Sequence, residues 1–268
     1  MASAIRPHRT VLALIAMAVV AVVAAIVVGA LRPWSAPVAE VEQAAAAEPA
    51  AITPAAIHLP EEPEVLVFGD SWTYGMSATP IERGYAYVLA DLISGTTVVD
   101  GVPGSGYVRP DRPDFGSRIA ELDPEASYDL IILQGSINDR WEPAEGYRDA
   151  VNAAWDALAA TYPETPIVVL GPAPQVLPVE EPTARIDGDL AALAAERQWW
   201  YISPLQDEWI TTQNYETVID TSEVARNHPS LAGHAYLAQR LADALDRIVD
   251  PATSLEAADA GAPEPAGP

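Results

Sequence analysis

The chain has 268 residues, enough for one sizeable α/β domain with appendages, and it contains no cysteine. The lack of cysteine excludes disulfide bonds, thiolate nucleophiles and cysteine zinc sites. The formal net charge of −24 repels phosphate backbones and anionic lipid headgroups, so we expect no nucleic-acid binding, and membrane attachment requires a hydrophobic anchor.

A hydrophobic segment near the N-terminus can supply that anchor. Residues 11–31 are uncharged and mostly aliphatic, long enough as a helix to cross a bilayer core of about 30 Å. Arg6 and Arg9 precede the segment, which predicts a cytoplasmic N-terminus at residues 1–10 and an extracytoplasmic remainder. The alternative is a signal peptide cleaved after residues 28–30. We therefore expect a single-pass membrane protein, or a secreted protein if the segment is cleaved.

Two low-complexity segments flank the presumptive domain. Residues 32–63 are rich in Ala, Pro and Glu and have no hydrophobic period, which predicts a disordered linker. Residues 251–268 have a similar composition and are predicted to be a disordered tail. The catalytic domain is therefore expected to span residues 64–250.

Between these flanks, short apolar runs alternate with amphipathic segments. The predicted strands are Val65–Phe68, Thr96–Val99, Leu130–Leu133, Ile167–Leu170 and Trp199–Ile202. The predicted helices are Tyr85–Ile93, Phe115–Leu122, Glu145–Thr161, Pro182–Arg197 and Leu231–Val249. This alternation predicts a three-layer α/β/α sandwich around a five-stranded parallel sheet, with its active site at the C-terminal edge of the strands.

A candidate nucleophile follows the first predicted strand. The strand ends abruptly in Gly69-Asp70-Ser71, which places a serine at the strand tip, where open α/β sheets bind their ligands. Gly-Asp-Ser alone is a weak motif, because short motifs arise by chance. A serine hydroxyl also needs a neighbouring base that removes its proton during attack, so the prediction depends on a suitable histidine.

The histidines narrow the choice of base. His8 precedes the hydrophobic segment and His58 lies in the linker, which leaves His228 and His234. Pro229 biases His228 away from helical backbone, so His228 is expected in a loop from which it can reach another strand's tip. His234 lies inside the last helix and is better placed to pack locally. We predict His228 as the base and His234 as a structural residue; the alternative is that both are structural.

Donors for a developing oxyanion are expected from three places. The backbone N–H of Ser71 is the first. The glycine-rich segment after the second strand offers Gly104 as the second donor, with Gly106 as the alternative. Asn138, after the third strand, offers its side-chain amide as the third donor. A buried, turn-forming asparagine would look the same in the sequence.

In this order, the motifs resemble the four blocks of the SGNH (GDSL-type) hydrolases, over roughly residues 64–249. The matching blocks are Gly69-Asp70-Ser71 with Gly75, the Gly104 loop, Asn138-Asp139 and His228-Pro229. Members are esterases, lipases and carbohydrate deacetylases with a flavodoxin-like α/β/α fold. The resemblance implies that Ser71 is the nucleophile and His228 the base. It also implies that Gly104 and Asn138 are oxyanion donors and that no metal or organic cofactor is needed.

Two positions depart from the family pattern. Ser136 stands where the third block usually has a glycine. Ala225 occupies the place of the family's aspartate, three residues before the catalytic histidine. That acid would orient the imidazole and stabilise the imidazolium. Glu223, Asp220 or a backbone carbonyl are the alternatives for orienting the ring.

Several large side chains adjoin the motifs. Trp72 and Trp141 follow the serine and asparagine blocks closely, so they are candidates for lining a substrate cleft, with core or rim packing as the alternative. Trp199 and Trp200 are expected to pack in a strand. Arg140 is expected to be a solvated or salt-bridged surface residue rather than a substrate contact.

Together, the motifs and the predicted topology indicate a membrane-anchored extracytoplasmic serine esterase that hydrolyses small O-acyl esters on cell-envelope or environmental glycans. Its expected partners are a small-molecule or glycan ester substrate and the membrane. Two alternatives keep the same fold: an O-acyltransferase that uses the same serine, and a non-catalytic glycan-binding or scaffold module, suggested by Ala225. A metal-dependent hydrolase is disfavoured, because its ligands would have to be mostly carboxylates.

Overall fold

The computed structural model describes residues 53–249. The predicted cytoplasmic N-terminus (1–10), the hydrophobic segment (11–31), residues 32–52 of the linker and the tail (251–268) lie outside the described residues. Within residues 53–249, no helix combines the length and the hydrophobicity that a membrane span requires.

Strands and helices alternate along the described chain. The strands are β1 (Glu64–Gly69), β2 (Thr96–Gly101), β3 (Leu130–Gln134), β4 (Ile167–Leu170), β5 (Trp200–Ile202), β6 (Ile219–Asp220) and β7 (His228–Pro229). The α-helices are α2 (Ser71–Tyr74), α3 (Tyr85–Leu92), α4 (Phe115–Ile119), α5 (Tyr147–Thr161), α6 (Glu181–Glu196), α7 (Tyr215–Val218) and α8 (Leu231–Leu245). Two 3₁₀-helices, η1 (Ile81–Arg83) and η2 (Ile137–Trp141), complete the set.

The main sheet has five strands in the order β2-β1-β3-β4-β5, and all of them run parallel. The predicted α/β fold with a five-stranded parallel sheet is therefore confirmed. In the register of the sheet, Val65 of β1 lies between Thr97 of β2 and Leu130 of β3. Since β1 lies between β2 and β3, the strand order reverses there. Ligands bind beyond the carboxyl ends of the strands at such a point.

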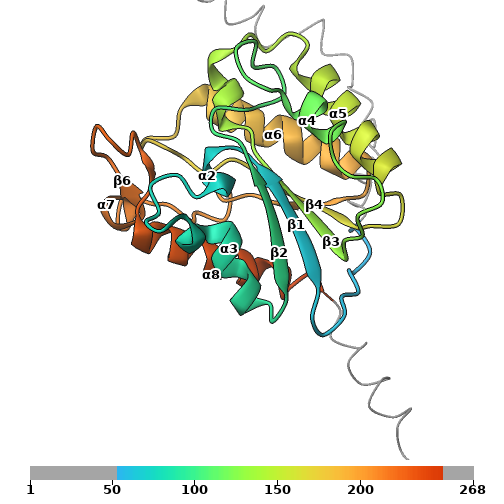
Figure 1. Cartoon of the computed structure of the whole chain (residues 1–268). Helices are drawn as coiled ribbons and strands as arrows, with labels where there is room; N and C mark the ends of the chain where they lie inside the picture. Colours follow the sequence, from blue (N-terminus) through green and yellow to red (C-terminus); the bar gives the residue numbers. More distant parts are fainter. Residues whose placement is uncertain (1–52, 250–268) are drawn as a thin grey trace, which may run out of the picture. The chain divides into compact units, whose positions relative to one another are not determined.

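Helices cover both faces of this sheet (Figure 1). Successive residues of β1 point to opposite faces: Val65 and Val67 pack in the cluster that includes residues of α3 and α8, whereas Leu66 and Phe68 pack with residues of α4, α5 and α6. Every residue of β3 is buried. A sheet covered on both sides requires such continuous apolar strands, which is why these runs could be recognised in the sequence.

A small second sheet, which the sequence did not predict, carries one of the two candidate histidines. β6 and β7 are antiparallel and pair Asp220 with His228. Directly after β7, the hydroxyl of Ser230 accepts the N–H of Gly233 at 2.9 Å and caps α8. His228, which was expected in a loop, therefore lies in the short strand β7, and the pairing with β6 and the cap of α8 fix its position.

The packed domain begins before the predicted boundary at residue 64. Ile57 is only 5% exposed and forms a β-bridge with Val249. The indole N–H of Trp200 donates a hydrogen bond to the carbonyl of Ala55 at 2.7 Å. Residues 53–63, expected to be disordered, therefore contact the domain. These contacts could not be predicted from the Ala- and Pro-rich composition of the segment, because the contacts involve one apolar side chain and backbone groups.

The ends of several elements also differ from the prediction. α4 stops at Ile119 rather than at Leu122, and α8 stops at Leu245 rather than at Val249. β2 continues to Gly101, beyond its predicted end at Val99. Capping and tertiary contacts set these ends, and neither is visible in a hydrophobic pattern.

Candidate active site

The predicted nucleophile lies at the carboxyl end of β1, next to the central strand β3. Ser71 is the first residue of α2, and the carboxylate of Asp70 caps this short helix by accepting the N–H of Trp72 at 2.9 Å. The side chain of Gln134, at the end of the neighbouring strand β3, accepts the N–H of Asp70 at 3.2 Å and the hydroxyl of Thr73 at 2.8 Å. Contacts from two strands therefore fix the turn that presents Ser71.

The predicted base is in hydrogen-bond contact with this serine. His228 Nε2 lies 2.8 Å from Ser71 Oγ, and His228 Nδ1 lies 2.6 Å from the carbonyl oxygen of Ala225. A carbonyl oxygen only accepts hydrogen bonds, so the ring proton must be on Nδ1. Nε2 is then unprotonated and can accept the hydroxyl proton of Ser71. This geometry is the one that general-base activation of a serine requires.

The Ala225 carbonyl takes the orienting position that the family gives to an aspartate. Of the two nearby acids considered in the sequence, Glu223 is exposed, and Asp220 accepts the backbone N–H of Ser222 at 2.9 Å. Neither of them forms a hydrogen bond with the His228 ring. The geometry therefore matches the third alternative, a backbone carbonyl, and no carboxylate of residues 53–249 forms a hydrogen bond with the His228 ring.

The surroundings of His228 favour the neutral form of its ring. Burial lowers the pKa of His228 below its ordinary value of 6.5, and the positive charge of Arg226 lowers the pKa further. The hydrogen bond to the Ala225 carbonyl opposes this shift, because it favours the imidazolium. The net direction is downward, which suits a residue that must accept a proton at neutral pH.

We expect the acidic limb of the kcat/KM–pH profile to have a midpoint below 6.5, the ordinary pKa of histidine. Only neutral His228 can accept the Ser71 proton, so activity is lost as pH falls through its pKa. Because that pKa is lowered, activity persists to a lower pH than an unperturbed histidine would allow. The profile of a neutral ester between about pH 4 and 8 checks this. A midpoint at or above the ordinary value would contradict it.

The other two predicted site residues lie in the same pocket. Ser71, Gly104, Asn138 and His228 all line one cavity of about 290 Å³. Gly104 has a φ of +81°, in the left-handed region that favours glycine, and it forms the turn that follows β2. The side-chain amide of Asn138 donates one hydrogen to the carbonyl of Ser105 at 2.9 Å. Since an amide nitrogen carries two hydrogens, the second remains for a ligand.

Asp139 joins the asparagine block to the glycine-rich loop. Its buried carboxylate accepts the N–H of Tyr107 at 2.8 Å and the N–H of Val108 at 3.1 Å. The same carboxylate occupies the space that a Cβ on Gly106 would need. A side chain at position 106 would therefore clash with Asp139, which gives Gly106 a packing reason to be glycine. The sequence placed Asp139 in a motif but did not show this role.

Arg118 is a second residue of the site that the sequence did not reveal. Its guanidinium is buried and donates at 2.8 Å to the carbonyl of Gly69, to the hydroxyl of Ser105 and to the carbonyl of Asp100. It also forms an ion pair with the Asp100 carboxylate at 2.6 Å. One side chain thus ties together the ends of β1 and β2 and the oxyanion loop. The only sequence signal is a charged residue inside the otherwise uncharged helix α4.

Asp70 is fully buried beside the nucleophile. One of its carboxylate oxygens accepts the Trp72 N–H, and the other has no hydrogen-bond partner within the described residues. Burial raises the pKa of Asp70 to about 6, and the negative charge of Asp139 adds to the rise. Ionised Asp70 is therefore disfavoured in the folded state.

We expect Asp70→Asn to become more stable relative to the wild type as pH rises. With a folded pKa of about 6 and an unfolded pKa near 3.8, the cost of ionising Asp70 is absent below both values and fully present above both. This cost is about 3 kcal/mol at neutral pH, and asparagine avoids it while keeping the Trp72 hydrogen bond. Urea unfolding at about pH 4 and pH 7.5 checks this, with exposed Asp91→Asn as the control. If the stability difference between Asp70→Asn and the wild type were the same at both pH values, the prediction would be contradicted.

The remaining candidates from the sequence have packing roles. The ring of His234 accepts the N–H of Tyr85 at 3.2 Å through Nδ1 and lies 2.9 Å from the Met76 carbonyl through Nε2, which fits the predicted structural role. Arg140 forms an ion pair with Glu180 at 3.1 Å, as expected of a salt-bridged arginine.

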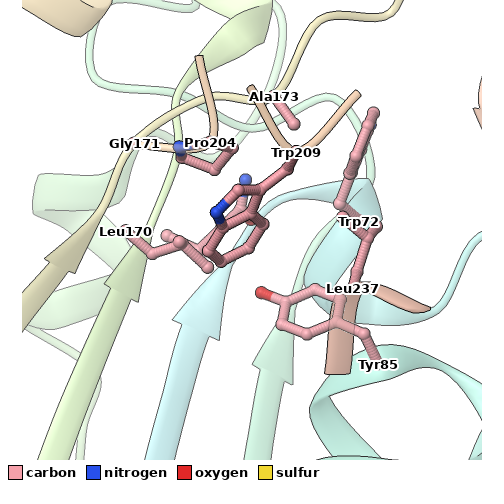
Figure 2. Close-up of a pocket in the computed structure, with 9 residues that line it drawn as sticks. Trp72, Tyr85, Leu170, Gly171, Ala173, Pro204, Trp209 and Leu237 are labelled. Atoms are coloured by element: carbon pink, nitrogen blue, oxygen red, sulfur yellow. The ribbon is translucent and has the colours of Figure 1, made fainter. Parts of the chain in front are cut away.

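The two tryptophans do not line the Ser71 pocket. Trp72 is 4% exposed and, together with Tyr85 and Trp209, lines a separate internal cavity of about 20 Å³ (Figure 2). Trp141 is 65% exposed, and the guanidinium of Arg140 lies 4.5 Å from its ring centroid. The packing alternative therefore holds for Trp72, whereas Trp141 is exposed to solvent and is not part of the pocket lining.

Comparisons with known proteins agree with this geometry. The model of the GDSL-like lipase/acylhydrolase family matches residues 67–250. A GDSL lipase of Mycobacterium tuberculosis is 28% identical over 176 residues, which are 64% of this chain and 71% of that protein.

Two solved structures have a similar fold. A carbohydrate acetylesterase family member from Sinorhizobium meliloti has a TM-score of 0.53 at 17% identity, over 70% of this chain and 99% of that chain. The native aryl esterase of M. smegmatis has a TM-score of 0.52 at 18% identity, over 70% of this chain and 100% of that chain. At sequence identities of 17% and 18%, the comparison shows that these proteins and this chain share a fold.

Proposed function

The chain belongs to the GDSL-like lipase/acylhydrolase family and is an ester-hydrolysing hydrolase, and on this premise we propose that it acts as a serine esterase through an acyl-enzyme on Ser71. The observation that carries the proposal is the hydrogen-bonded chain from Ser71 Oγ to His228 Nε2 and from His228 Nδ1 to the Ala225 carbonyl. This chain fixes the tautomer that leaves Nε2 free to accept a proton.

In the proposed reaction, Ser71 Oγ attacks the ester carbonyl while its proton moves to His228 Nε2. The N–H groups of Ser71 and Gly104 and the free amide hydrogen of Asn138 stabilise the oxyanion. The imidazolium then donates its proton to the departing alkoxide, which leaves an acyl group on Ser71. A water molecule, activated by the neutral His228, releases the acid and restores the serine.

We propose small O-acyl esters, such as acetyl groups on glycans, as substrates. The pocket that contains Ser71 has a volume of about 290 Å³, at the small end of ligand sites, which supports a short acyl group. The carbohydrate acetylesterase family member from S. meliloti has a similar fold, which also supports acetyl groups on glycans as substrates. A glycan substrate also agrees with the proposed location of the domain outside the cytoplasm, which rests on the hydrophobic segment 11–31 alone.

The hydrogen bond of the Ala225 carbonyl removes the argument for a non-catalytic binding module. The reason to consider such a module was the absence of an acid before His228. Since the carbonyl orients the ring in its place, that reason no longer distinguishes the two functions. An O-acyltransferase would use the same acyl-enzyme with a sugar hydroxyl in place of water.

The test is a panel of esters offered to the full-length protein in detergent. Aryl acetate, butyrate and octanoate compare acyl chain lengths, and O-acetylated xylan tests a glycan. We expect release of acetate to be fastest among the three aryl esters. Added sugar alcohols would become acetylated only by a transferase. Hydrolysis of none of these esters by the folded protein would overturn the proposed function.

A further inference from the structure

The pocket that contains Ser71 has a charge opposite to that of the whole protein. The chain carries 38 acidic residues against 14 arginines. Nevertheless, the residues that line this pocket include two arginines, Arg112 and Arg226, and no aspartate or glutamate. In so acidic a protein, a pocket whose only charged lining residues are arginines is an unusual local environment.

These two arginines also differ from most others in lacking a carboxylate partner. Between residues 53 and 249, seven of the eleven arginines form ion pairs with Asp or Glu. Arg109 and Arg140, which are close to the site, pair with Glu142 and Glu180. In this part of the chain, no carboxylate lies within ion-pair distance of Arg112 or Arg226. Their guanidinium groups are exposed and available to a ligand.

The two arginines stand beside different parts of the catalytic machinery. The side chain of Arg112 lies over the Gly104 turn, with its Nε 3.4 Å from the position that a Cβ on Gly104 would take. Arg226 belongs to the β6–β7 loop and is two residues before His228. Its backbone has a φ of +50°, and its N–H donates to the Ser222 carbonyl at 2.8 Å. One arginine therefore flanks the oxyanion side of the pocket and the other flanks the base.

Acids lie close to both arginines in sequence without pairing with them. Asp111 directly precedes Arg112 and Glu223 lies three residues before Arg226, but neither carboxylate is within ion-pair distance of these arginines. Asp114 follows Arg112 closely, but its carboxylate caps α4 by accepting the N–H of Ser117 at 2.9 Å. The chain thus places acids near the pocket without using them to neutralise its arginines. A guanidinium is planar and binds carboxylates and phosphates through paired hydrogen bonds.

We propose that Arg112 and Arg226 bind an anionic group, a carboxylate or a phosphate, on the alcohol part of the ester. The preferred substrates are therefore O-acyl esters of acidic compounds, such as sugars that carry a negative charge. The inference rests on the proposed esterase function of the same pocket. The anion belongs to the alcohol part because a short acyl group has no room for one.

The experiment compares kcat/KM for three aryl acetates with the full-length protein. These are 3-carboxyphenyl acetate, 3-phosphonophenyl acetate and the neutral 3-(hydroxymethyl)phenyl acetate. We expect the wild type to prefer at least one anionic ester, and the preference to weaken as salt is added. We expect Arg112→Gln and Arg226→Gln each to lower the anionic-to-neutral ratio about three- to tenfold. The anionic-to-neutral ratio is compared because loss of the Arg226 charge also changes the pKa of His228. That change acts on the hydrolysis of all three esters and cancels in the ratio.

Two sets of variants separate charge at the site from charge in general. Arg83→Gln removes an exposed arginine that is not part of the pocket lining, and we expect it to leave the ratio unchanged. Arg112→Lys and Arg226→Lys keep the charge and should recover part of the preference. A wild type without preference for either anion, or ratios unaffected by Arg112→Gln and Arg226→Gln, would overturn the inference.

Binding of 3-hydroxybenzoate, the alcohol product, distinguishes failure of this inference from failure of the proposed function. Hydrolysis of all three esters at similar rates would contradict the anion site and leave the esterase standing. No hydrolysis, with 3-hydroxybenzoate binding that Arg112→Gln and Arg226→Gln weaken, would contradict the esterase and support the anion site. Neither hydrolysis nor arginine-dependent binding would overturn both.

Discussion

Ser71→Ala is expected to lower kcat/KM for acetyl-ester hydrolysis by at least about 10,000-fold, because the acyl-enzyme cannot form without the serine hydroxyl. The variant should fold normally. Among residues 53–249, the hydroxyl of Ser71 has a single side-chain partner, His228, and the substitution leaves the backbone that holds the turn unchanged. Steady-state hydrolysis of an aryl acetate measures the loss, and far-ultraviolet circular dichroism checks the fold.

Ser127→Ala is the matched control for this loss. Ser127 is exposed and far along the chain from the site, so its substitution should leave the rate unchanged. A Ser71→Ala protein that keeps more than a small fraction of wild-type activity would show that another group attacks the ester.

His228→Ala is expected to lower kcat/KM by a similar factor, about 10,000-fold or more, because Ser71 then lacks the base that removes its proton. Since serine and base act as a unit, their losses should not add. The double variant Ser71→Ala/His228→Ala should be about as slow as either single variant. The three rates are measured on the same neutral ester, with His58→Gln as the histidine control.

Additive losses in this comparison would contradict the proposed pair. They would mean that Ser71 and His228 contribute separately to the rate. In that case, His228 would act on the leaving group or the water without activating the serine.

The fold was largely predictable because its determinants are local and repeated. β1, β3 and β4 each contain a continuous run of four apolar residues, which is what a buried parallel sheet requires. Ile57 could not be predicted in the same way, since a single apolar residue in an Ala- and Pro-rich segment has no period. Its burial depends on the bridge to Val249, a partner almost two hundred positions away.

The candidate site was predictable to the extent that its residues lie in short motifs. The structure brings Ser71, Gly104, Asn138 and His228 into one pocket, as their places at the sheet edge implied. The carbonyl of Ala225 was one of three open alternatives, because a sequence does not show where a backbone oxygen points. Arg118 was missed, because its role arises from four contacts made to distant parts of the chain.

Substrate contacts were the least predictable part of the site. Trp72 adjoins Ser71 in sequence, but the helical turn of α2 directs its side chain into the core instead of the pocket. Arg112 and Arg226 belong to loops without recognisable motifs, and tertiary structure alone brings them to the pocket. Short sequence motifs therefore predict the proposed catalytic residues better than they predict the residues that contact the substrate.

The most direct test of the account is covalent labelling of the full-length protein with a fluorophosphonate, followed by mass spectrometry of the intact chain and its peptides. The account predicts one adduct per chain, located on Ser71 and absent from Ser71→Ala. It also predicts much slower labelling of His228→Ala, because that variant lacks the base. A folded wild-type protein that takes up no label, or that is labelled on another residue, would contradict it.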